Sequence, residues 1–184
     1  MPHRKRNFLL LHVVRQLKTF SFLPFISCLL AFLLNACSFN PAIQGSGEAY
    51  LQGEWQQDSL SGQKQMITYS LGDFKFDCDS FLITANTVSK IDYGTDSCTK
   101  SGRWTEYIKG RYWQNNDTLH VKGMFYNADG SMKNASSCLR KGVYEEFFSV
   151  KKRSDSSIVL SGTSSVIPLS LRLVKRTVCK PKPL

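Results

Sequence analysis

The sequence predicts an all-β domain, folded as a single antiparallel up-and-down barrel of about eight strands. After residue 48, apolar residues do not recur with the spacing of a helix, about 3.6 residues. Instead, short segments rich in aromatic and β-branched residues alternate apolar with polar side chains, as strands do. Gly, Asn, Asp and Ser separate these segments roughly every ten residues. A closed barrel is favoured because closure leaves no strand edge free, and a β-sandwich or another small barrel is the alternative.

The first 36 residues have the organisation of a signal peptide, which is removed from the mature protein. Residues 1–19 contain five basic residues and no acidic residue, and residues 20–34 form an apolar run. That run is shorter than the roughly 20 apolar residues of a membrane-spanning helix, so it suits the hydrophobic region of a signal peptide. An uncleaved signal anchor and ordinary cleavage after a small residue are the alternatives.

The apolar run ends in Leu34-Asn35-Ala36-Cys37, which resembles a bacterial lipobox. The resemblance implies that Cys37 receives lipid, becomes the mature N-terminus and anchors the protein in the cell envelope. By the same resemblance, Ser38 in the next position implies the outer membrane, with the domain facing the periplasm. Residues 37–48 contain Gly, Pro and polar residues and are expected to be a flexible tether, with the barrel domain at 49–184.

The charge of the mature chain does not indicate nucleic-acid binding. The formal net charge is +10, but five of the 24 basic residues lie in the leader, which lowers the mature excess to about five. The remaining basic residues are dispersed, with 151–153 and 175–176 as the compact groups. A solvated surface, or attraction to anionic lipid headgroups, explains this pattern better than nucleic acid does.

The cysteines of the body are expected to form two disulfides, because an even number of cysteines in an exported domain is typical of cross-linking. These residues are Cys78, Cys98, Cys138 and Cys179, and they allow three pairings. We favour Cys78–Cys98 and Cys138–Cys179, since the first pair flanks what the pattern predicts to be one hairpin and its loop. A metal or redox site is not expected, because no CxxC spacing occurs and the body contains a single histidine.

The expected strands follow the alternation of apolar side chains along the body. Their ranges are 50–56, 64–70, 74–78, 80–88, 103–113, 118–126, 139–152, 158–161 and 167–174. Within 103–113 the alternation shifts near Gly110, which predicts a β-bulge there. Residues 115–117 are turn-forming types and predict a hairpin with the next strand. In that strand Leu119, Val121, Gly123 and Phe125 are expected to share one face.

Gly53-Glu54-Trp55 near the start of the body and Arg172 near its end resemble the signature of lipocalins and related calycins. In that family a Gly-x-Trp motif lies in the first strand, and a basic side chain comes from the last strand. The resemblance implies a barrel in which Trp55 closes one end, Arg172 stacks on the indole, and Gly53 lets the chain pass close beneath. A cation–π contact of this kind is worth about 0.5–2 kcal/mol.

Three stretches, 36–41, 50–55 and 74–81, are similar to a family of small lipoproteins of Bacteroidota. Members of that family often carry the automated name fumarate hydratase. The sequence lacks the loop and lysine motif of one fumarase class. The other class needs an iron–sulfur cluster in a reducing compartment, and both classes are far longer chains. The resemblance therefore implies a small envelope lipoprotein, and no motif supports fumarase chemistry.

No catalytic, metal or cofactor site is expected. His120 alternates with apolar residues, so it should point away from the core, and it has neither a nucleophile motif nor enough partner ligands for zinc. Acidic residues occur in 77–79 and 92–96, but without the spacing of a calcium-binding loop. Glu145 and Glu146 are adjacent in a strand, which places only one of them inside, so paired glycosidase carboxylates are not indicated.

Aromatic residues in the barrel strands are the best candidates for function. Most should pack in the core, because an eight-stranded barrel is just wide enough to be filled by side chains or to hold one small ligand. Those that could line a cavity for a small hydrophobic ligand are Trp104, Tyr112, Phe125, Tyr144 and Phe147. The sequence thus predicts a lipid-anchored, non-catalytic binding protein with no known protein partner. The alternatives are a structural protein that docks an envelope complex and an enzyme.

Overall fold

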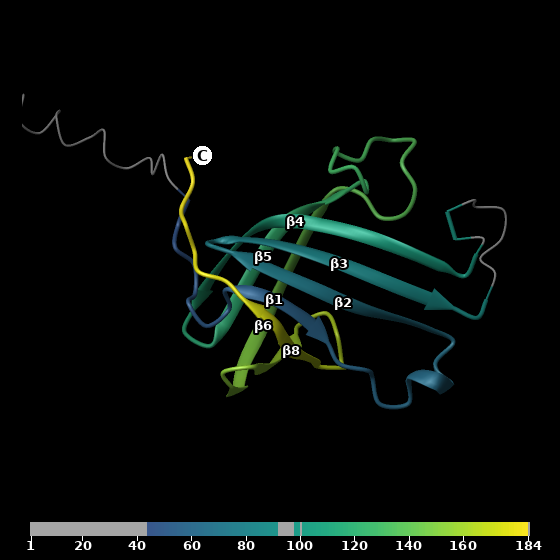
Figure 1. The fold of residues 1–184 in the computed structure, drawn as a ribbon. Coiled ribbons are helices and arrows are strands. Elements are labelled where there is room, and N and C mark those ends of the chain that lie inside the picture. Colours follow the sequence, from purple (N-terminus) through teal and green to yellow (C-terminus); the bar gives the residue numbers. More distant parts are fainter. Residues whose placement is uncertain (1–43, 92–97, 100, 184) are drawn as a thin grey trace, which may run out of the picture. The chain divides into compact units, whose positions relative to one another are not determined.

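The computed structural model describes residues 44–91, 98–99 and 101–183. Within them the chain forms eight strands, each antiparallel to the next, and β8 pairs with β1 to close the barrel (Figure 1). The predicted all-β, up-and-down barrel is confirmed, and its strand order is the one expected of a lipocalin-like fold. The leader, Cys37 and the acidic residues 92–96 lie outside the described residues.

Most of the described chain lies in strands. They are β1 (Gly53–Gln57), β2 (Thr68–Asp77), β3 (Ser80–Ser89), β4 (Arg103–Asn115), β5 (Thr118–Tyr126), β6 (Val143–Ser154), β7 (Ser157–Gly162) and β8 (Leu169–Arg176). A short 3-10 turn, η2 (Gln63–Gln65), lies between β1 and β2. In the described part of the chain, no helix has the length and hydropathy that crossing a membrane requires.

The expected strands 64–70 and 74–78 are a single strand, β2, paired without interruption to β3. Gly72 lies between them, and glycine is a turn-forming residue type, which explains the false break in the prediction. Gln57 Oε1 accepts the N–H of Gly72 at 2.8 Å, and a Cβ added at this glycine would meet the Phe74 ring at 2.6 Å. The glycine therefore makes room for a core phenylalanine and does not end the strand.

The β-bulge predicted near Gly110 is wrong, because the pairing of β4 with both β3 and β5 is continuous along the described strands. Gly110 lies opposite Gly123 of β5. A Cβ at Gly110 would lie 2.1 Å from the Lys122 carbonyl oxygen, too close for any real contact. The two glycines thus allow a close approach of two strands. Irregular pairing occurs instead between β1 and β8 and between β6 and β7.

The alternation predicted for β5 is confirmed. Leu119, Val121 and Phe125 are buried inside the barrel, and His120 lies on the outer face. Side chains from the other strands join them in one hydrophobic cluster, whose aromatic members are Trp55, Phe74, Phe76, Phe81, Tyr112, Phe125 and Phe148. Burying an aliphatic or phenylalanine side chain contributes about 1.5–3 kcal/mol relative to leaving it exposed, so this cluster is the main source of stability.

The two ends of the barrel differ in the length of their connections (Figure 1). At the closed end the strands are joined by short turns at 78–79, 116–117 and 155–156. The segment 44–52 lies against the first of these turns, at 78–79. At the open end the strands are joined by the longer connections 58–67, 90–102, 127–142 and 163–168. Because successive strands run in opposite directions, the connections alternate between the two ends.

Two disulfides are present among the described cysteines, as predicted, but they are Cys78–Cys179 and Cys98–Cys138. The favoured pairing of Cys78 with Cys98 and of Cys138 with Cys179 is wrong. Cys78 lies in a closed-end turn and Cys98 in an open-end connection, so the ten residues of β3 separate them. A disulfide needs Cα atoms within about 7 Å, and each observed bond therefore joins segments at the same end.

Candidate ligand-binding site

Trp55 lies in the core, and its cationic partner is Arg176. The indole is 2% exposed, and its Nε1 donates to the Leu51 carbonyl at 2.7 Å. The Arg176 guanidinium lies 5.4 Å from the centre of the indole ring. Arg172 instead pairs with Asp58 at 3.6 Å on the exposed outer wall. The stacking role predicted for Arg172 is therefore wrong.

An irregularity in the pairing of β1 with β8 explains why a different arginine reaches the indole. Trp55 pairs with Leu173, and Glu54 pairs with Lys175. Val174, which lies between them in β8, therefore has no partner in β1. An extra residue in one strand reverses the alternation of the side chains that follow it. Arg176 thereby comes to the inner side, opposite Gly53. A Cβ at Gly53 would meet a β8 carbonyl oxygen at 2.3 Å, which confirms the close passage predicted for this glycine.

Gln52 connects the segments of the closed end through buried hydrogen bonds. Its amide oxygen accepts the Cys78 N–H at 2.7 Å, and its amide nitrogen donates to the Cys78 carbonyl and the Tyr112 hydroxyl, both at 2.9 Å. The Glu48 N–H also donates to the Tyr112 hydroxyl, at 3.1 Å. Burial raises the pKa of Tyr112 to about 12, although these hydrogen bonds oppose the rise. The fold itself thus uses both the ring and the hydroxyl of Tyr112.

The five residues predicted to line a cavity lie in different surroundings. Tyr112 and Phe125 belong to the buried core. Trp104 and Tyr144 are half-buried on the inner side, each one residue inside the open end of its strand. Phe147 is exposed on the outer face, because its two neighbours in β6 take the inner positions. The prediction that Phe147 lines the interior is therefore wrong.

A buried carboxylate holds the β5–β6 connection at the open end. Glu106 of β4 is 3% exposed, and its oxygens accept hydrogen bonds from the Arg140 guanidinium at 2.7–3.1 Å. These hydrogen bonds raise the pKa of Arg140 above its ordinary value. The same guanidinium lies 5.0 Å from the centre of the Phe125 ring. Because Cys138 is bonded to Cys98, the connection is fixed at two neighbouring points.

A second buried carboxylate holds the β7–β8 connection. Glu146 of β6 is 6% exposed, and its Oε1 accepts the N–H groups of Thr163 at 3.0 Å and Ser164 at 3.2 Å. The Ser164 hydroxyl donates to the other oxygen. Burial opposes ionisation of this carboxyl, but the hydrogen bonds outweigh burial and lower its pKa. Glu145, its neighbour, is exposed and paired with Lys122, so only one of the two adjacent glutamates points inside, as predicted.

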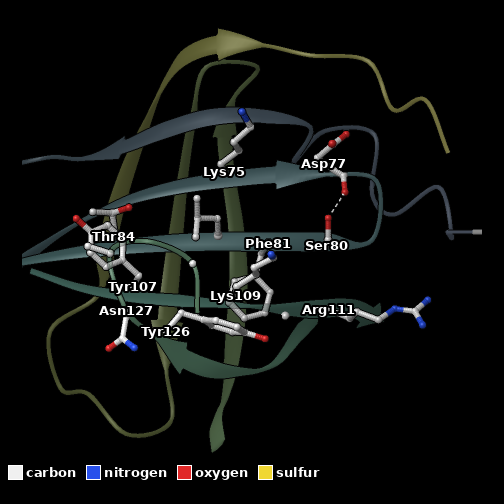
Figure 2. Close-up of a pocket in the computed structure, with 14 residues that line it drawn as sticks. Lys75, Asp77, Ser80, Phe81, Thr84, Tyr107, Lys109, Arg111, Tyr126 and Asn127 are labelled. Atoms are coloured by element: carbon white, nitrogen blue, oxygen red, sulfur yellow. Dashed lines mark hydrogen bonds between the residues drawn. The ribbon is translucent and has the colours of Figure 1, made fainter. Parts of the chain in front are cut away.

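A hollow of about 620 Å³ lies on the outer wall of the barrel, over β2–β5, and the start of the β5–β6 connection borders it (Figure 2). Most of the side chains that form it point outward and alternate with core residues along each strand. Those that matter chemically are Lys75, Leu82, Tyr107, Lys109, Arg111 and Tyr126. We expected a ligand inside the barrel, and this hollow lies outside it.

The walls of the hollow are aromatic and aliphatic. Tyr107 and Tyr126 lie opposite each other in the β4–β5 pair, and Leu82 lies opposite Lys109 in the β3–β4 pair. Figure 2 shows Lys109 beside Tyr126, with Tyr107 and Arg111 on either side of it along β4. The Lys109 Nζ lies 5.6 Å from the centre of the Tyr126 ring. The hollow therefore offers an apolar surface with a cation on it.

The cations around the hollow differ in their partners. Lys75 is paired with Glu54 at 3.1 Å, and Arg111 is paired with Asp79. Among the residues that the structure describes, Lys109 has no ion pair with a carboxylate. An acidic group on a bound molecule would thus find its free ammonium partner at Lys109.

Within 44–91, 98–99 and 101–183, no group of three or more His, Cys, Asp or Glu side chains is placed to hold a metal ion. His120 contacts two aromatic rings on the outer wall. The chain matches no protein-family model, no curated protein and no solved structure.

Two signals in the sequence point to the hollow, although the strand pattern alone does not reveal it. Tyr107, Lys109 and Arg111 alternate with buried residues, so they share the face directed away from the core. The tight turn at 116–117 fixes the register of β4 against β5, and that register brings Tyr126 opposite Tyr107. Taken together, the alternation and the turn predict an aromatic pair with a lysine on the outer wall.

Proposed function

We propose that this protein is a lipid-anchored protein of the cell envelope that acts by binding a small molecule. The lipobox-like sequence that ends at Cys37 supports the anchor, and a tether and a barrel domain follow it. Disulfides at both ends of the described barrel support a compartment outside the cytoplasm, where oxidising conditions preserve them. On the resemblance of Cys37 and Ser38 to sorting signals, we propose that the protein lies at the outer membrane, facing the periplasm. On the similarity of the stretches 36–41, 50–55 and 74–81, we propose that it belongs to the family of small Bacteroidota lipoproteins.

The ligand that we propose is a small, mainly hydrophobic molecule with one acidic group, bound in the outer hollow. The hollow itself carries this proposal, because about 620 Å³ falls within the roughly 300–1,000 Å³ of small-molecule sites. Leu82, Tyr107 and Tyr126 supply apolar contacts. Lys109 supplies an ammonium without an ion pair among the described residues, which would pair with the acidic group.

A second location for the same class of ligand is the inner face near the open end. Trp104 and Tyr144 support it, because both are half-buried and point inward there. Entry from this end would require movement of the β5–β6 connection, which Glu106 and Arg140 hold in place. The outer hollow needs no such movement, so we favour it.

Native mass spectrometry of the mature, lipid-anchored protein, released from membranes in detergent, tests the proposed ligand. A bound small molecule is expected on the wild type and is expected to be lost in Lys109→Ala. Lys75→Ala is the matched control, because Lys75 borders the same hollow but is already paired with Glu54. Loss of the molecule only in Trp104→Phe would move the site to the interior. A wild-type chain without any bound molecule would contradict binding and favour a structural protein that docks an envelope complex.

Metabolic labelling with a fatty-acid probe tests the proposed anchor independently of the ligand. The wild-type chain is expected to take up the probe, and Cys37→Ala is expected to abolish the labelling. The matched control is Cys28→Ala, because Cys28 lies in the apolar run that is removed with the leader. Labelling that persists in Cys37→Ala would contradict the lipobox interpretation.

A further inference from the structure

We infer that an aromatic patch on the outer face of β4–β6 brings the barrel into contact with the membrane in which the protein is anchored. The patch consists of Trp113, His120 and Phe147, which lie on neighbouring strands. The partner is the headgroup region of a bilayer that contains anionic phospholipid. This inference rests on the proposed N-terminal anchor, because the anchor determines which end of the barrel lies near the membrane. It concerns different residues from the proposed ligand site.

The patch consists of rings in direct contact across three neighbouring strands. Trp113 pairs with His120, which pairs with Phe147. The Trp113 and His120 rings are stacked with centres 5.2 Å apart, and Phe147 meets the imidazole edge-on at 4.5 Å. Trp113 is nevertheless 47% exposed, and Phe147 is exposed as well. Tryptophan is enriched at membrane–water interfaces, because its ring prefers an apolar surrounding while its N–H prefers water.

The tether leaves the barrel beside this patch. The side chain of Gln44 donates to the Asp77 carbonyl and to the Ser80 hydroxyl, both at 3.0 Å. Ser80 lies opposite Arg111 of β4, two positions before Trp113. Trp113 and the exit of the tether therefore share the closed end of the barrel, whereas Phe147, at the other side of the patch, accepts the N–H of Thr163 in an open-end connection at 3.0 Å.

The tether is short in comparison with the barrel strands. Cys37 and Gln44 are seven positions apart, and an extended chain spans at most about 3.6 Å per residue, so these residues lie within about 25 Å of each other. Strand β4, with 13 residues, is about 44 Å long. A lipid on Cys37 would therefore keep the closed end within reach of the headgroups, while the open end can extend away from them.

The C-terminal segment adds further groups that suit an anionic bilayer. Val178 is 80% exposed, and its neighbour Cys179 is bonded to the closed-end turn at Cys78. Lys180 and Lys182 follow, and both are exposed, with Lys182 also paired to Asp77 at 3.9 Å. The Lys182 carbonyl accepts the N–H of Gln44 at 2.9 Å, so these lysines lie at the exit of the tether. Basic residues held within about 10 Å of an anionic membrane surface are attracted to it.

Quenching of tryptophan fluorescence by brominated lipids tests the inference. The mature protein, purified from membranes, is reconstituted into vesicles of phosphatidylcholine and phosphatidylglycerol, with or without bromine on the acyl chains near the headgroup. Trp55 is in the core and Trp104 points inward, so a quenched component belongs to Trp113 and should disappear in Trp113→Phe. Ile67→Trp in the Trp113→Phe background is the matched control, because Ile67 is exposed in the open-end connection 58–67, which joins two strands outside the patch.

The expected result is a loss of most of the Trp113 emission, with no loss of emission from the Ile67→Trp reporter. That result supports the inference whether or not the fatty-acid probe labels Cys37. If Trp113 remains unquenched in a labelled, vesicle-bound protein, the inference is overturned and the anchor stands. Equal quenching of both reporters also overturns it, since the domain then has no preferred face. Quenching of Trp113 without labelling contradicts only the lipid on Cys37.

Discussion

The closed and open ends of the barrel are held by different proportions of apolar packing and buried charge. At the closed end, Trp55 is buried, Gln52 bonds to main-chain atoms and a tyrosine hydroxyl, and one buried carboxylate, Asp79, accepts a main-chain N–H at 3.1 Å. At the open end, long connections are held by two buried carboxylates, Glu106 and Glu146. Apolar packing thus dominates at the closed end and buried carboxylates at the open end. The two ends should therefore respond differently to mutation.

Trp55→Ala is expected to have the largest effect on stability. The indole is almost completely buried, and replacing such a side chain with alanine lowers the free energy of unfolding by about 3–5 kcal/mol. Trp104→Ala, at the open end, is the matched comparison and should cost less, because Trp104 is only half-buried. Urea denaturation followed by circular dichroism measures both. An equal loss in the two variants would contradict the difference between the ends.

Removal of each disulfide is expected to cost about 2–4 kcal/mol. The sequence separation is 101 for Cys78–Cys179 and 40 for Cys98–Cys138. In the chain-entropy model the longer loop adds about 0.8 kcal/mol, so paired serine substitutions at the closed end should destabilise more. Denaturation of the two double variants measures this difference. Peptide mapping without reduction checks the pairing, and a Cys78–Cys98 peptide would contradict it.

Glu146→Gln is expected to lower the free energy of unfolding by about 1–3 kcal/mol near neutral pH, because a buried acceptor of several hydrogen bonds loses its charge. The pKa of Glu146 is lowered in the folded state, so its contribution is complete above the ordinary pKa of 4.5. That contribution is lost as the pH falls through the lower folded-state pKa. The wild type should therefore approach the variant in stability below about pH 4.5. A difference that stays constant between neutral and acidic pH would contradict this assignment.

The two arginines of β8 should give the smallest effects, and these should be unequal. Arg176→Ala removes a cation–π contact with Trp55 and a hydrogen bond to the Tyr50 carbonyl at 2.6 Å, and we expect a loss of about 1–2 kcal/mol. Arg172→Ala removes an exposed ion pair with Asp58, worth less than about 1 kcal/mol. Thermal denaturation of both variants measures the order. A larger effect of Arg172→Ala would restore the partner that the lipocalin-like motif implies.

The fold could be predicted because its signals are local. Leu119, Val121 and Phe125 alternate with outward residues, and the turn at 116–117 joins two strands of this kind. Both the alternation and the turn can be recognised without knowledge of the rest of the chain. Gly72 and Gly110 misled the prediction for the same reason. Their local chemistry indicates a turn or a bulge, whereas the structure uses them for the close approach of a phenylalanine and of a second strand.

The site could be predicted less well because it depends on two properties that are not local. These are whether a side chain points inward or outward, and which end of the barrel a residue occupies. One unpaired residue, Val174, decides whether Arg172 or Arg176 faces Trp55. The disulfide pairing depends on the end at which each cysteine lies, and the length of β3 decides that. The outer hollow arises from side chains on four strands, β2 to β5, so no single segment of the sequence contains it.

The Cys78–Cys179 bond has a mechanical consequence for a protein held by its N-terminus. A pulling force on the tether would reach the barrel at Gln44, which bonds to the main chain at Asp77 and Lys182. These two segments are linked covalently through Cys78 and Cys179. Tension would therefore be shared between the β2–β3 turn and the C-terminal segment, and it would not peel β1 away from its neighbours. Reduction of this one bond should lower the force at which the domain unfolds.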